Sequence, residues 1–474
     1  MKILKLLSKA CSIFLLAPLL AACTSDVPTV SVSLAPKVSN TIVVSNVAVF
    51  DSRSLQVTPN RDVVVKGREI VDVVEHNPAK VWTDAQVISG QDATLVPGLI
   101  DMHGHITTTT GPSWEFSLPR PEANLLAYVY SGVTTVFDPG DSSDDAYERR
   151  AKVASGELIG PQIFTAGRII TSPHGHPRSL VENLAPWWAK WYLIDKIASG
   201  IANQEDVMAE VNELSDAGAD AIKIVVDSIP LDSEQMSDEL IGALVDHAKQ
   251  RGLRTVAHTG TTQDAIRAAD AGVALWVHGV YKERIPDSLV DQLVNYGIPM
   301  VSTSEVFDRY GRALSGPIKP SKLERETVPL EVLESFHPVP EDFDIGVLES
   351  WAVLMSNTID IRLDNVRRLH QAGMTILAGS DTQSGVFPGA GMHRELATLV
   401  RAGLTPAQAL RAATLDPAIY LANGKAPDRG VIEEGKRADL LLVNGDPLRD
   451  ISALADIREV ILNGQLLKRK AIAK

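Results

Sequence analysis

The sequence predicts an α/β protein: a (β/α)8 TIM barrel with a small β-sandwich domain built from both the N- and the C-terminal segments. Two observations predict this fold class. Between residues 97 and 422, short apolar strand candidates alternate with helical segments, which is the pattern of a parallel barrel. On either side of this region, Val- and Ile-rich runs are separated by Gly, Pro and Asn, which is the pattern of strands and hairpins.

The β-sandwich is predicted to take residues 41–96 from the beginning of the chain and residues 423–474 from its end. Strands are expected at 41–49, 62–65, 69–74, 438–445 and 459–464. Isolated short strands cannot bury an apolar face by themselves. We therefore expect the two ends of the chain to meet in one domain.

The barrel is predicted to span residues 97–422, and a chain of 474 residues is long enough for both units. Its eight strand candidates are 99–105, 134–138, 162–165, 221–226, 255–258, 274–278, 299–302 and 375–381. Helices are expected between successive strands, among them 238–250, 262–270 and 365–372. Residues 304–361, rich in Pro and charge, are expected to form an elaborated connection that covers the active face.

The first residues have the features of a secretory signal. Lys2, Lys5 and Lys9 give a positive start, and the apolar run at 10–20 is too short to remain as a membrane anchor. The run ends in Leu20-Ala21-Ala22-Cys23, which resembles a bacterial lipobox and implies cleavage before Cys23 with a lipid on its sulfur. An ordinary signal peptide cut near Ala22 is the alternative.

This interpretation divides the beginning of the chain into a signal at residues 1–22 and a tether at residues 23–40, which is polar and contains Pro28 and Pro36. It also predicts a location. Thr24, rather than Asp, follows the cysteine, and this favours a lipid-anchored protein of the bacterial cell envelope, in the outer membrane and facing the periplasm.

Composition narrows the function to small-molecule chemistry. The formal net charge of −14 argues against general nucleic-acid binding, which needs a basic face. Both cysteines, Cys11 and Cys23, lie in the first segment, so the folded body has no cysteine for a disulfide or a metal site. Any metal must be held by His, a carboxylate or a modified Lys.

Chemically active residues fall at or near the ends of the predicted barrel strands, where barrel enzymes place their chemistry. They are His103, His105, Lys223, His258, His278 and Asp381. Each alone has an ordinary structural explanation, such as a hydrogen-bonded core histidine, a lysine that reaches out of a strand, or a helix-capping aspartate. Lys223 is the most informative, because a cation flanked by Ile222 and Ile224 is costly to bury without a partner.

These motifs together resemble the amidohydrolase superfamily, and within it the imidazolonepropionase-like or prolidase-like metal-dependent amidohydrolases. The resemblance covers nearly the whole chain after the signal. It rests on residues 97–105, 132–136, 219–223, 257–258, 278–279, 379–381, 404–414 and 430–440.

The resemblance implies a binuclear metal centre in which Lys223 is carboxylated and bridges two divalent ions, with zinc as the first choice. His103, His105 and Asp381 would bind one ion, and His258 and His278 the other. A hydroxide between the ions would attack an amide carbonyl, and Asp381 would pass its proton to the leaving amine. The expected substrates are dipeptides or N-acyl amino acids.

Three other functions remain open within the superfamily: a cyclic amidase, a lactonase or a deaminase. Deaminating relatives usually work with one metal and lack the bridging lysine, so Lys223 counts against a deaminase. A non-catalytic binding lipoprotein is less favoured, because all six ligand positions are filled.

A second group of residues is assigned to substrate binding or left open. His174, His176 and Arg178 follow a predicted strand and are candidates for the substrate pocket, with a solvated loop as the alternative. His393 is expected to support the site or begin a helix. A cluster of three tryptophans predicts a pocket floor, a subunit contact in a homo-oligomer or ordinary packing: Trp187, Trp188 and Trp191.

Overall fold

The computed structural model of the chain describes residues 27–472, except residues 113, 116, 186, 189, 314–316, 339 and 341–345. The predicted signal at 1–22 and the predicted lipid site at Cys23 lie outside the described residues. Among the helices of the described part, none has both the length and the apolar character that crossing a membrane requires.

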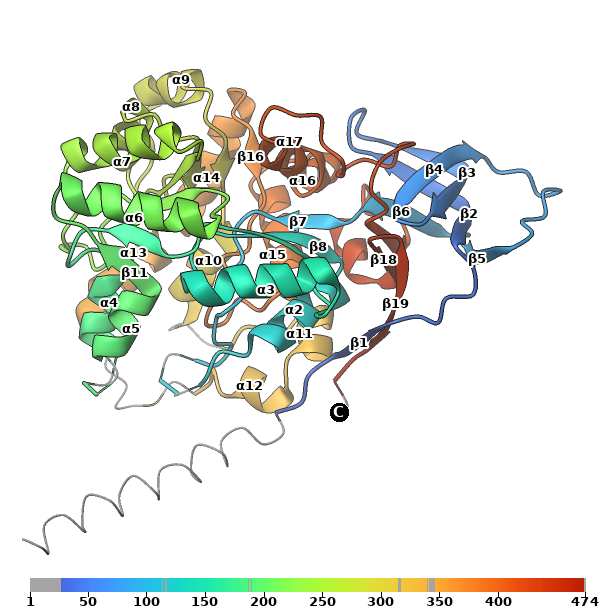
Figure 1. Cartoon of the computed structure of the whole chain (residues 1–474), viewed down its shortest axis with the longest axis horizontal. Helices are drawn as coiled ribbons and strands as arrows, with labels where there is room; N and C mark the ends of the chain where they lie inside the picture. Colours follow the sequence, from blue (N-terminus) through green and yellow to red (C-terminus); the bar gives the residue numbers. More distant parts are fainter. Residues whose placement is uncertain are drawn as a thin grey trace, which may run out of the picture.

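A parallel β/α barrel and a smaller β domain lie side by side (Figure 1). The barrel strands are β7 (Leu99–Asp101), β8 (Val133–Asp138), β9 (Gln162–Thr165), β10 (Ile169–Thr171), β12 (Ile222–Val225), β13 (Thr255–His258), β14 (Leu275–Val277), β15 (Met300–Val301) and β16 (Ile376–Leu377), with β11 (Ala198–Gly200) beside β10. They pair in the orders β7-β8-β9 and β11-β10-β12-β13-β14-β15-β16. The predicted barrel is therefore confirmed.

The third barrel position holds two short strands instead of the one expected at 162–165. β9 pairs with β8, and β10 pairs with β12. Three residues between them contain Gly167, whose φ of 71° lets the chain turn between the two pairings. A break in the strand thus joins the two sheets into one barrel.

Backbone hydrogen bonds close the barrel between its first and last strands. The N–H of Met102 donates to the carbonyl of Ala378 at 3.0 Å, and the N–H of Asp381 donates to the carbonyl of His103 at 2.6 Å. The interior is filled by side chains that include Ile100, Met102, Phe137 and Leu377. The barrel centre is consequently a packed core rather than a pore.

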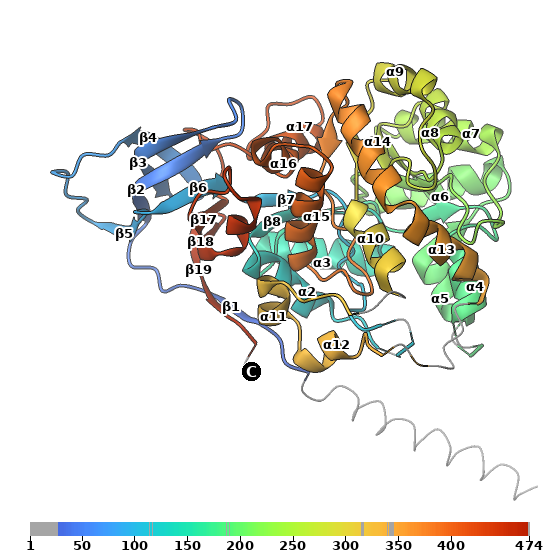
Figure 2. The same ribbon diagram turned by 180° about the vertical axis from the view of Figure 1, so that it is seen from behind.

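Helices surround the barrel and fill its connections (Figures 1 and 2). They are α2 (Pro121–Tyr130), α3 (Ser143–Ser155), α4 (Arg178–Leu184), α5 (Lys190–Ile197), α6 (Gln204–Ala217), α7 (Asp238–Gln250), α8 (Thr262–Asp270), α9 (Asp287–Asn295), α10 (Ser304–Ala313), α11 (Lys322–Thr327), α12 (Leu330–Glu334), η1 (Gly346–Leu348), α13 (Glu349–Asn357), α14 (Ile359–Gln371), α15 (Ala390–Arg401), α16 (Pro406–Ala412) and α17 (Leu415–Leu421). The expected helices at 238–250 and 262–270 are confirmed as α7 and α8.

Local capping explains these two boundaries. The Ser237 side chain accepts a hydrogen bond from the N–H of Leu240 at the start of α7. Thr261 and Asp264 form a capping box at the start of α8, which satisfies backbone donors that have no partner within the helix. The expected helix at 365–372 is longer than predicted, because α14 already begins at Ile359.

Strands from both ends of the chain form the smaller domain, as expected. They are β1 (Ser31–Leu34), β2 (Thr41–Asp51), β3 (Gln56–Lys66), β4 (Glu69–Glu75), β5 (Ala85–Ser89), β6 (Ala93–Pro97), β17 (Leu440–Asn444), β18 (Ile457–Leu462) and β19 (Gln465–Lys470), with the short helix η2 (Ile451–Ala455) between β17 and β18. Figure 1 shows the blue N-terminal and red C-terminal strands next to each other.

The predicted sandwich takes the form of one mixed sheet, with the order β1-β19-β18-β17-β6-β2-β3-β4. β2 is long enough to change partner along its length. Its first half pairs with β5 and its second half with β6. The sheet therefore divides at β2 and encloses a separate apolar core, which includes Val44, Val63, Leu95 and Leu440.

Part of the predicted tether is ordered, and the prediction for residues 23–40 needs this correction. Ser31–Leu34 forms β1, which pairs antiparallel with β19. Val32 is buried while its neighbours Ser31 and Ser33 are exposed. This alternation fits a half-buried edge strand, and β1 thereby covers an edge of β19 that would otherwise be unpaired.

Gly98 marks the junction between the β domain and the barrel. It lies between β6 and β7, and its N–H donates to the carbonyl of Asp439 at 2.8 Å. A Cβ atom at this position would lie 2.3 Å from Thr134 Oγ1. Glycine is therefore required for the two units to pack this closely.

The core of the β domain gives a stability prediction. Leu95 is fully buried in it, so Leu95→Ala should lower the free energy of unfolding by about 2–5 kcal/mol through lost burial and a cavity. Urea unfolding followed by circular dichroism measures the change. Val81→Ala is the control, because Val81 is 82% exposed and its truncation should change stability by less than about 0.5 kcal/mol. Equal stability of the two variants would show that this core contributes little.

Candidate metal centre

The six predicted ligand residues come together at the carboxyl ends of the barrel strands. His103 and His105 follow β7, His258 ends β13, His278 follows β14 and Asp381 follows β16; Lys223 points inward from β12. All six line one cavity of about 360 Å³. The convergence expected from the sequence is thus present.

Three ligand atoms form a tight corner at the end of β7. His103 Nε2 lies 3.1 Å from His105 Nε2, and Asp381 Oδ1 lies 3.4 Å from the former and 3.2 Å from the latter. Ligands about 2.0–2.1 Å from a tetrahedral zinc ion are about 3.3 Å from one another. The spacing of these atoms therefore fits one divalent ion bound by all three.

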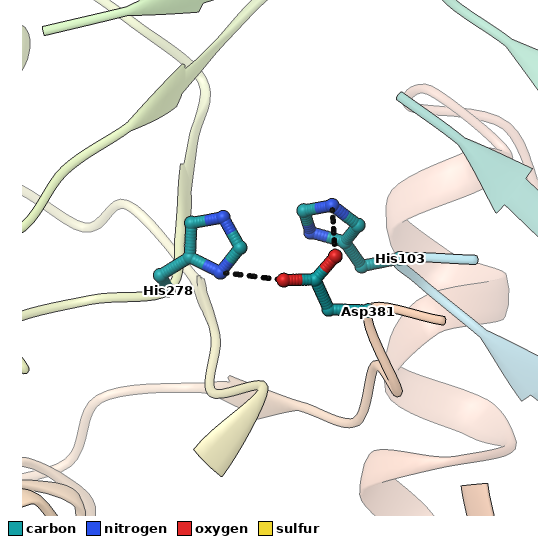
Figure 3. A group of neighbouring side chains, drawn as sticks. All are labelled: His103, His278 and Asp381. Carbon is teal, nitrogen blue, oxygen red and sulfur yellow. Dashed lines mark ion pairs between the residues drawn. The ribbon is translucent and has the colours of Figure 1, made fainter. Parts of the chain in front are cut away.

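Asp381 also faces the opposite side of the cavity. Figure 3 shows its carboxylate between His103 and His278, with Oδ2 3.7 Å from His278 Nδ1. Ligand atoms of these three buried residues lie within 4.8 Å of one another. Beyond His278, the ring of His258 follows at a centroid distance of 4.1 Å. The imidazoles thus continue from one side of Asp381 to the other.

Hydrogen bonds orient three of the four imidazoles. His105 Nδ1 donates to the carbonyl of Gly140 at 3.0 Å, His278 Nδ1 bonds Thr303 Oγ1 at 2.7 Å, and His258 Nε2 lies 3.1 Å from Asp227 Oδ2. A ring nitrogen that donates leaves the lone pair on the other nitrogen, which is the arrangement of metal-binding histidines. His103 Nδ1 is buried and has no hydrogen-bond partner among the described residues.

The sequence did not reveal Asp227, the partner of His258. The Asp227 side chain is fully buried and accepts three further hydrogen bonds. Its Oδ1 accepts from Lys282 Nζ at 2.5 Å and from the N–H of Ser228 at 2.7 Å, and its Oδ2 accepts from the Tyr281 hydroxyl. A Cβ at Gly260 would lie 2.5 Å from both carboxylate oxygens. Glycine at that position leaves room for the carboxylate. The available signal was the position of Asp227, four residues after Lys223 in the same strand region.

Burial shifts the pKa of most of these groups toward their neutral forms. It lowers the pKa of His103, His258 and His278 well below the usual range, and nearby positive groups add to this effect. Burial also lowers the pKa of Lys223 to about 7, against the opposing attraction of Asp381. No carboxylate of the described residues forms an ion pair with Lys223. The site therefore favours the neutral form of these three imidazoles and shifts Lys223 toward the neutral amine.

His105 and Asp381 behave as a pair of opposite charge. Burial lowers the pKa of His105, but hydrogen bonds to Asp138 and Asp381 outweigh it and raise the value to about 10. Burial raises the pKa of Asp381, but its hydrogen bond with His105 and the nearby positive groups outweigh that effect and lower it. A cation in this corner would replace the proton on His105 Nε2, because both use the same lone pair.

Unusual backbone conformations aim these side chains. His278 has a φ of 77°, Thr303 of 42° and Asp381 of 50°. Positive φ is costly for residues other than glycine and concentrates at functional sites. All three residues follow barrel strands, so the chain turns sharply where its side chains must point into the cavity.

The three predicted substrate residues have different outcomes. His176 lines the cavity, with its ring 5.2 Å from that of His258 and its buried Nδ1 unpartnered among the described residues. Burial lowers its pKa to about 4. His174 and Arg178 do not line this cavity. The His174 side chain is 73% exposed beside Glu182, and Arg178 is held by the carbonyls of Pro173 and Ala198.

His393 was expected to support the site or to begin a helix. His393 lies in the first turn of α15 and donates from Nε2 to the carbonyl of Ser131 at 2.8 Å, so it joins α15 to the end of α2, as a helix-start residue does.

The packing interpretation of Trp187, Trp188 and Trp191 is wrong, because their exposed fractions are 84%, 56% and 73%.

The connection after β15 covers the active face, as expected. Phe307 and Tyr310 on α10, and Trp351 on α13, line the metal cavity from this side. Phe307 also stacks on Tyr281, with ring centroids 3.9 Å apart. Three aromatic side chains therefore belong to the cavity wall, and Phe307 packs between His278, at a ring-centroid distance of 5.4 Å, and Tyr281, which bonds Asp227.

Four imidazoles, a lysine and a carboxylate meet at the carboxyl ends of the barrel strands. This arrangement is typical of metal-dependent barrel enzymes. Comparison with known proteins gives the family. Residues 94–467 match the Amidohydrolase family. The chain belongs to this family of hydrolases.

Individual relatives are distant, and their matches cover from 18% to 90% of the chain. Ochratoxinase of Aspergillus niger is 24% identical over 408 residues, which are 80% of this chain and 76% of that protein. Imidazolonepropionase of Deinococcus deserti is 38% identical over 87 residues, 18% of this chain and 21% of that protein. The crystal structure of a Xaa-Pro dipeptidase with bound methionine has a TM-score of 0.72 and 24% identity, covering 90% of this chain and 99% of that one.

The carboxylate that orients His258 gives a prediction about metal binding. Replacing Asp227 alone would leave Lys282 as a buried, unpaired cation, so the test is the double variant Asp227→Asn with Lys282→Met. We expect it to fold and to bind zinc about 10–100-fold more weakly, because an amide can donate as well as accept and no longer fixes the His258 tautomer as the carboxylate does.

Competition with a chromophoric chelator measures the zinc affinity. Asp216→Asn is the matched control, because the Asp216 side chain is 69% exposed and pairs with Arg251 at the surface. Wild-type affinity in the folded double variant would show that Asp227 does not support the metal centre.

Proposed function

We propose that the protein is a binuclear metal-dependent hydrolase that cleaves the amide bond of N-acyl amino acids or dipeptides. The observation that carries this proposal is the corner of His103 Nε2, His105 Nε2 and Asp381 Oδ1, whose mutual distances of 3.1–3.4 Å suit a single divalent ion. His258, His278 and Lys223 supply ligands for a second ion in the same cavity.

Zinc is the first choice of metal, because the donor set contains nitrogen and oxygen but no thiolate. Divalent ions at these ligands, when bound, supply Lewis acidity that lowers the pKa of water and polarises a carbonyl group. The remaining chemistry belongs to the side chains of this chain.

Lys223 is the proposed bridge between the two halves of the site. Its pKa of about 7 leaves much of the amine neutral near neutral pH, and only the neutral amine attacks CO₂. The nitrogen lone pair forms the new N–C bond, and the π electrons of one C=O bond of CO₂ move to its oxygen. The nitrogen then loses a proton to solvent, which leaves a carbamate. The resulting carbamate replaces a buried cation by an anionic ligand, which resolves the cost of burying Lys223 among apolar side chains.

Asp381 is the proposed proton carrier. Its lowered pKa keeps the carboxylate ionised, so it accepts a proton from the attacking water and delivers it to the nitrogen of the leaving amine. Its position among the candidate ligands, with both oxygens facing imidazoles, supports this role.

His176 is the remaining polar candidate for substrate contact. Its pKa of about 4 favours the neutral ring, and because the residue lines the cavity, it is the candidate for a hydrogen bond to the substrate. The aromatic wall of Phe307, Tyr310 and Trp351 suits an apolar substituent beside the amide.

The alternative activities are less well supported. A one-metal deaminase leaves no role for Lys223, and a non-catalytic binding protein leaves the strained backbone and the complete ligand set unexplained. The name of the structural neighbour, Xaa-Pro dipeptidase, supports the peptide-like class, whereas a cyclic amidase or a lactonase would use the same ligands on another carbonyl.

The cellular setting is part of the proposal. A lipid on Cys23 would attach the protein to the outer membrane, with the catalytic domain in the periplasm. The exposed Trp187, Trp188 and Trp191 offer an apolar surface for a homo-oligomer.

The role of Asp381 gives a catalytic prediction. Asp381→Asn should retain the fold and lower kcat on a good N-acyl amino acid by about 10²–10⁴-fold, because an amide cannot carry the proton. Steady-state kinetics at saturating zinc measure the effect, and circular dichroism checks the fold. Asp195→Asn, on the surface with a side chain 77% exposed, is the control. Near-wild-type kcat in Asp381→Asn would rule out the proton-carrying role.

A further inference from the structure

We propose that a second, apolar chamber beside the metal cavity binds the acyl chain of the substrate, so that the preferred substrates are N-acyl amino acids with long or bulky apolar acyl groups. This inference rests on the proposed amide hydrolysis and chooses between its two substrate classes.

The chamber lies between α10, α12 and the turn that follows Asp381. Its volume of about 670 Å³ is typical of a small-molecule site. Its apolar lining includes the side chains of Trp114, Ile318, Leu333, Phe336 and Phe387. The rings of Trp114 and Phe336 are 6.3 Å apart, and those of Phe336 and Phe387 are 6.0 Å apart. A space of this size and polarity favours an apolar occupant over water.

A thin wall separates this chamber from the metal cavity. Tyr310 lines both spaces, and its hydroxyl donates to Gln383 Oε1 at 2.5 Å. Gln383 faces the metal cavity, while the next two residues, Ser384 and Gly385, line the chamber. The Tyr310 side chain and the tight turn therefore form part of the boundary between the two spaces.

The turn at residues 383–386 holds this wall in place. The N–H of Gln383 donates to the carbonyl of Val386 at 3.1 Å, and the N–H of Val386 donates back at 2.8 Å. On the other side, the Tyr310 side chain is held by its hydrogen bond to Gln383 and by a ring contact with Trp351 at a centroid distance of 5.0 Å, so its rotation requires both contacts to break. An acyl chain whose carbonyl lies at the metal ligands reaches the chamber past this residue.

The charges of the chamber decide which half of the substrate it accepts. The guanidinium of Arg309 pairs with Glu324 at 2.5 Å and with Glu305 at 3.0 Å, and Arg394 also pairs with Glu324. Glu334 is exposed at the solvent side. Arg309 thus has no free charge for the carboxylate of an amino acid, and the ammonium of a free dipeptide would lose its hydration here. An uncharged acyl chain carries no such cost.

A series of N-acetyl-, N-hexanoyl- and N-decanoyl-L-leucine tests the proposal on the zinc-loaded full chain. Each methylene group buried in the chamber should raise kcat/KM by about fourfold, until the chamber is full. In Leu333→Gln, which adds a polar amide to the chamber wall, the ratio of kcat/KM for the decanoyl and acetyl substrates should fall at least about fivefold. The ratio is taken within one protein, so a loss of folded enzyme does not affect it.

Val353→Gln is the matched control, because Val353 is on α13, 50% exposed, and lines neither space; its ratio should stay at the wild-type value. Calorimetric titration with decanoate gives a readout that does not depend on turnover. Decanoate should bind wild type and Val353→Gln equally and Leu333→Gln at least about fivefold more weakly.

The outcomes separate this inference from the proposed function. Rising kcat/KM that Leu333→Gln abolishes supports both. Hydrolysis of all three substrates at equal kcat/KM overturns the chamber proposal and leaves the amide hydrolase intact. Decanoate binding that Leu333→Gln weakens, without hydrolysis of any N-acyl amino acid or dipeptide, supports the chamber as an apolar binding site and overturns the proposed function.

Discussion

The closure of the barrel between β7 and β16 is the constraint on which the metal centre depends. The Asp381 N–H donates to the His103 carbonyl at 2.6 Å, and the buried Asp101 carboxylate accepts the N–H groups of His103 at 3.1 Å and Ser380 at 2.9 Å. The backbone contacts that join the first strand to the last therefore also place the three atoms of the first metal corner. The same contacts close the barrel and position the candidate ligands, so the site requires a closed barrel.

Burial makes this arrangement chemically useful and also costly. The cavity lowers the pKa of His103, His258, His278 and Lys223, which favours the neutral forms whose lone pairs can bind a metal or react. The same burial demands partners for every polar atom. Asp227, Thr303 and the Gly140 carbonyl provide them for three imidazoles, whereas Nδ1 of His103 has no partner among the described residues. Most of the polar support thus lies outside the six ligand positions.

The barrel and the meeting of both chain ends could be predicted because periodicity and strand patterns are local signals. The convergence of the six candidate ligands could be predicted because barrel strands end at a common face. The interrupted third strand, the ordered β1 and the Asp227–Tyr281–Lys282 network could not, because each depends on contacts between distant segments. Arg178 shows the same limit: its position in the sequence suggested the substrate pocket, whereas the carbonyls of Pro173 and Ala198 hold its guanidinium elsewhere. The chamber behind Tyr310 has no sequence signature, because helices from separate segments enclose it.

The central claim is that the six ligands hold two metal ions that are needed for amide hydrolysis. The most direct measurement is a zinc titration of the metal-free protein in bicarbonate buffer, with bound metal and hydrolysis of an N-acyl amino acid followed in the same samples. The account predicts that activity rises with zinc and reaches its plateau at about two equivalents per chain. A plateau at one equivalent, or two bound ions without hydrolysis of any amide, would contradict it.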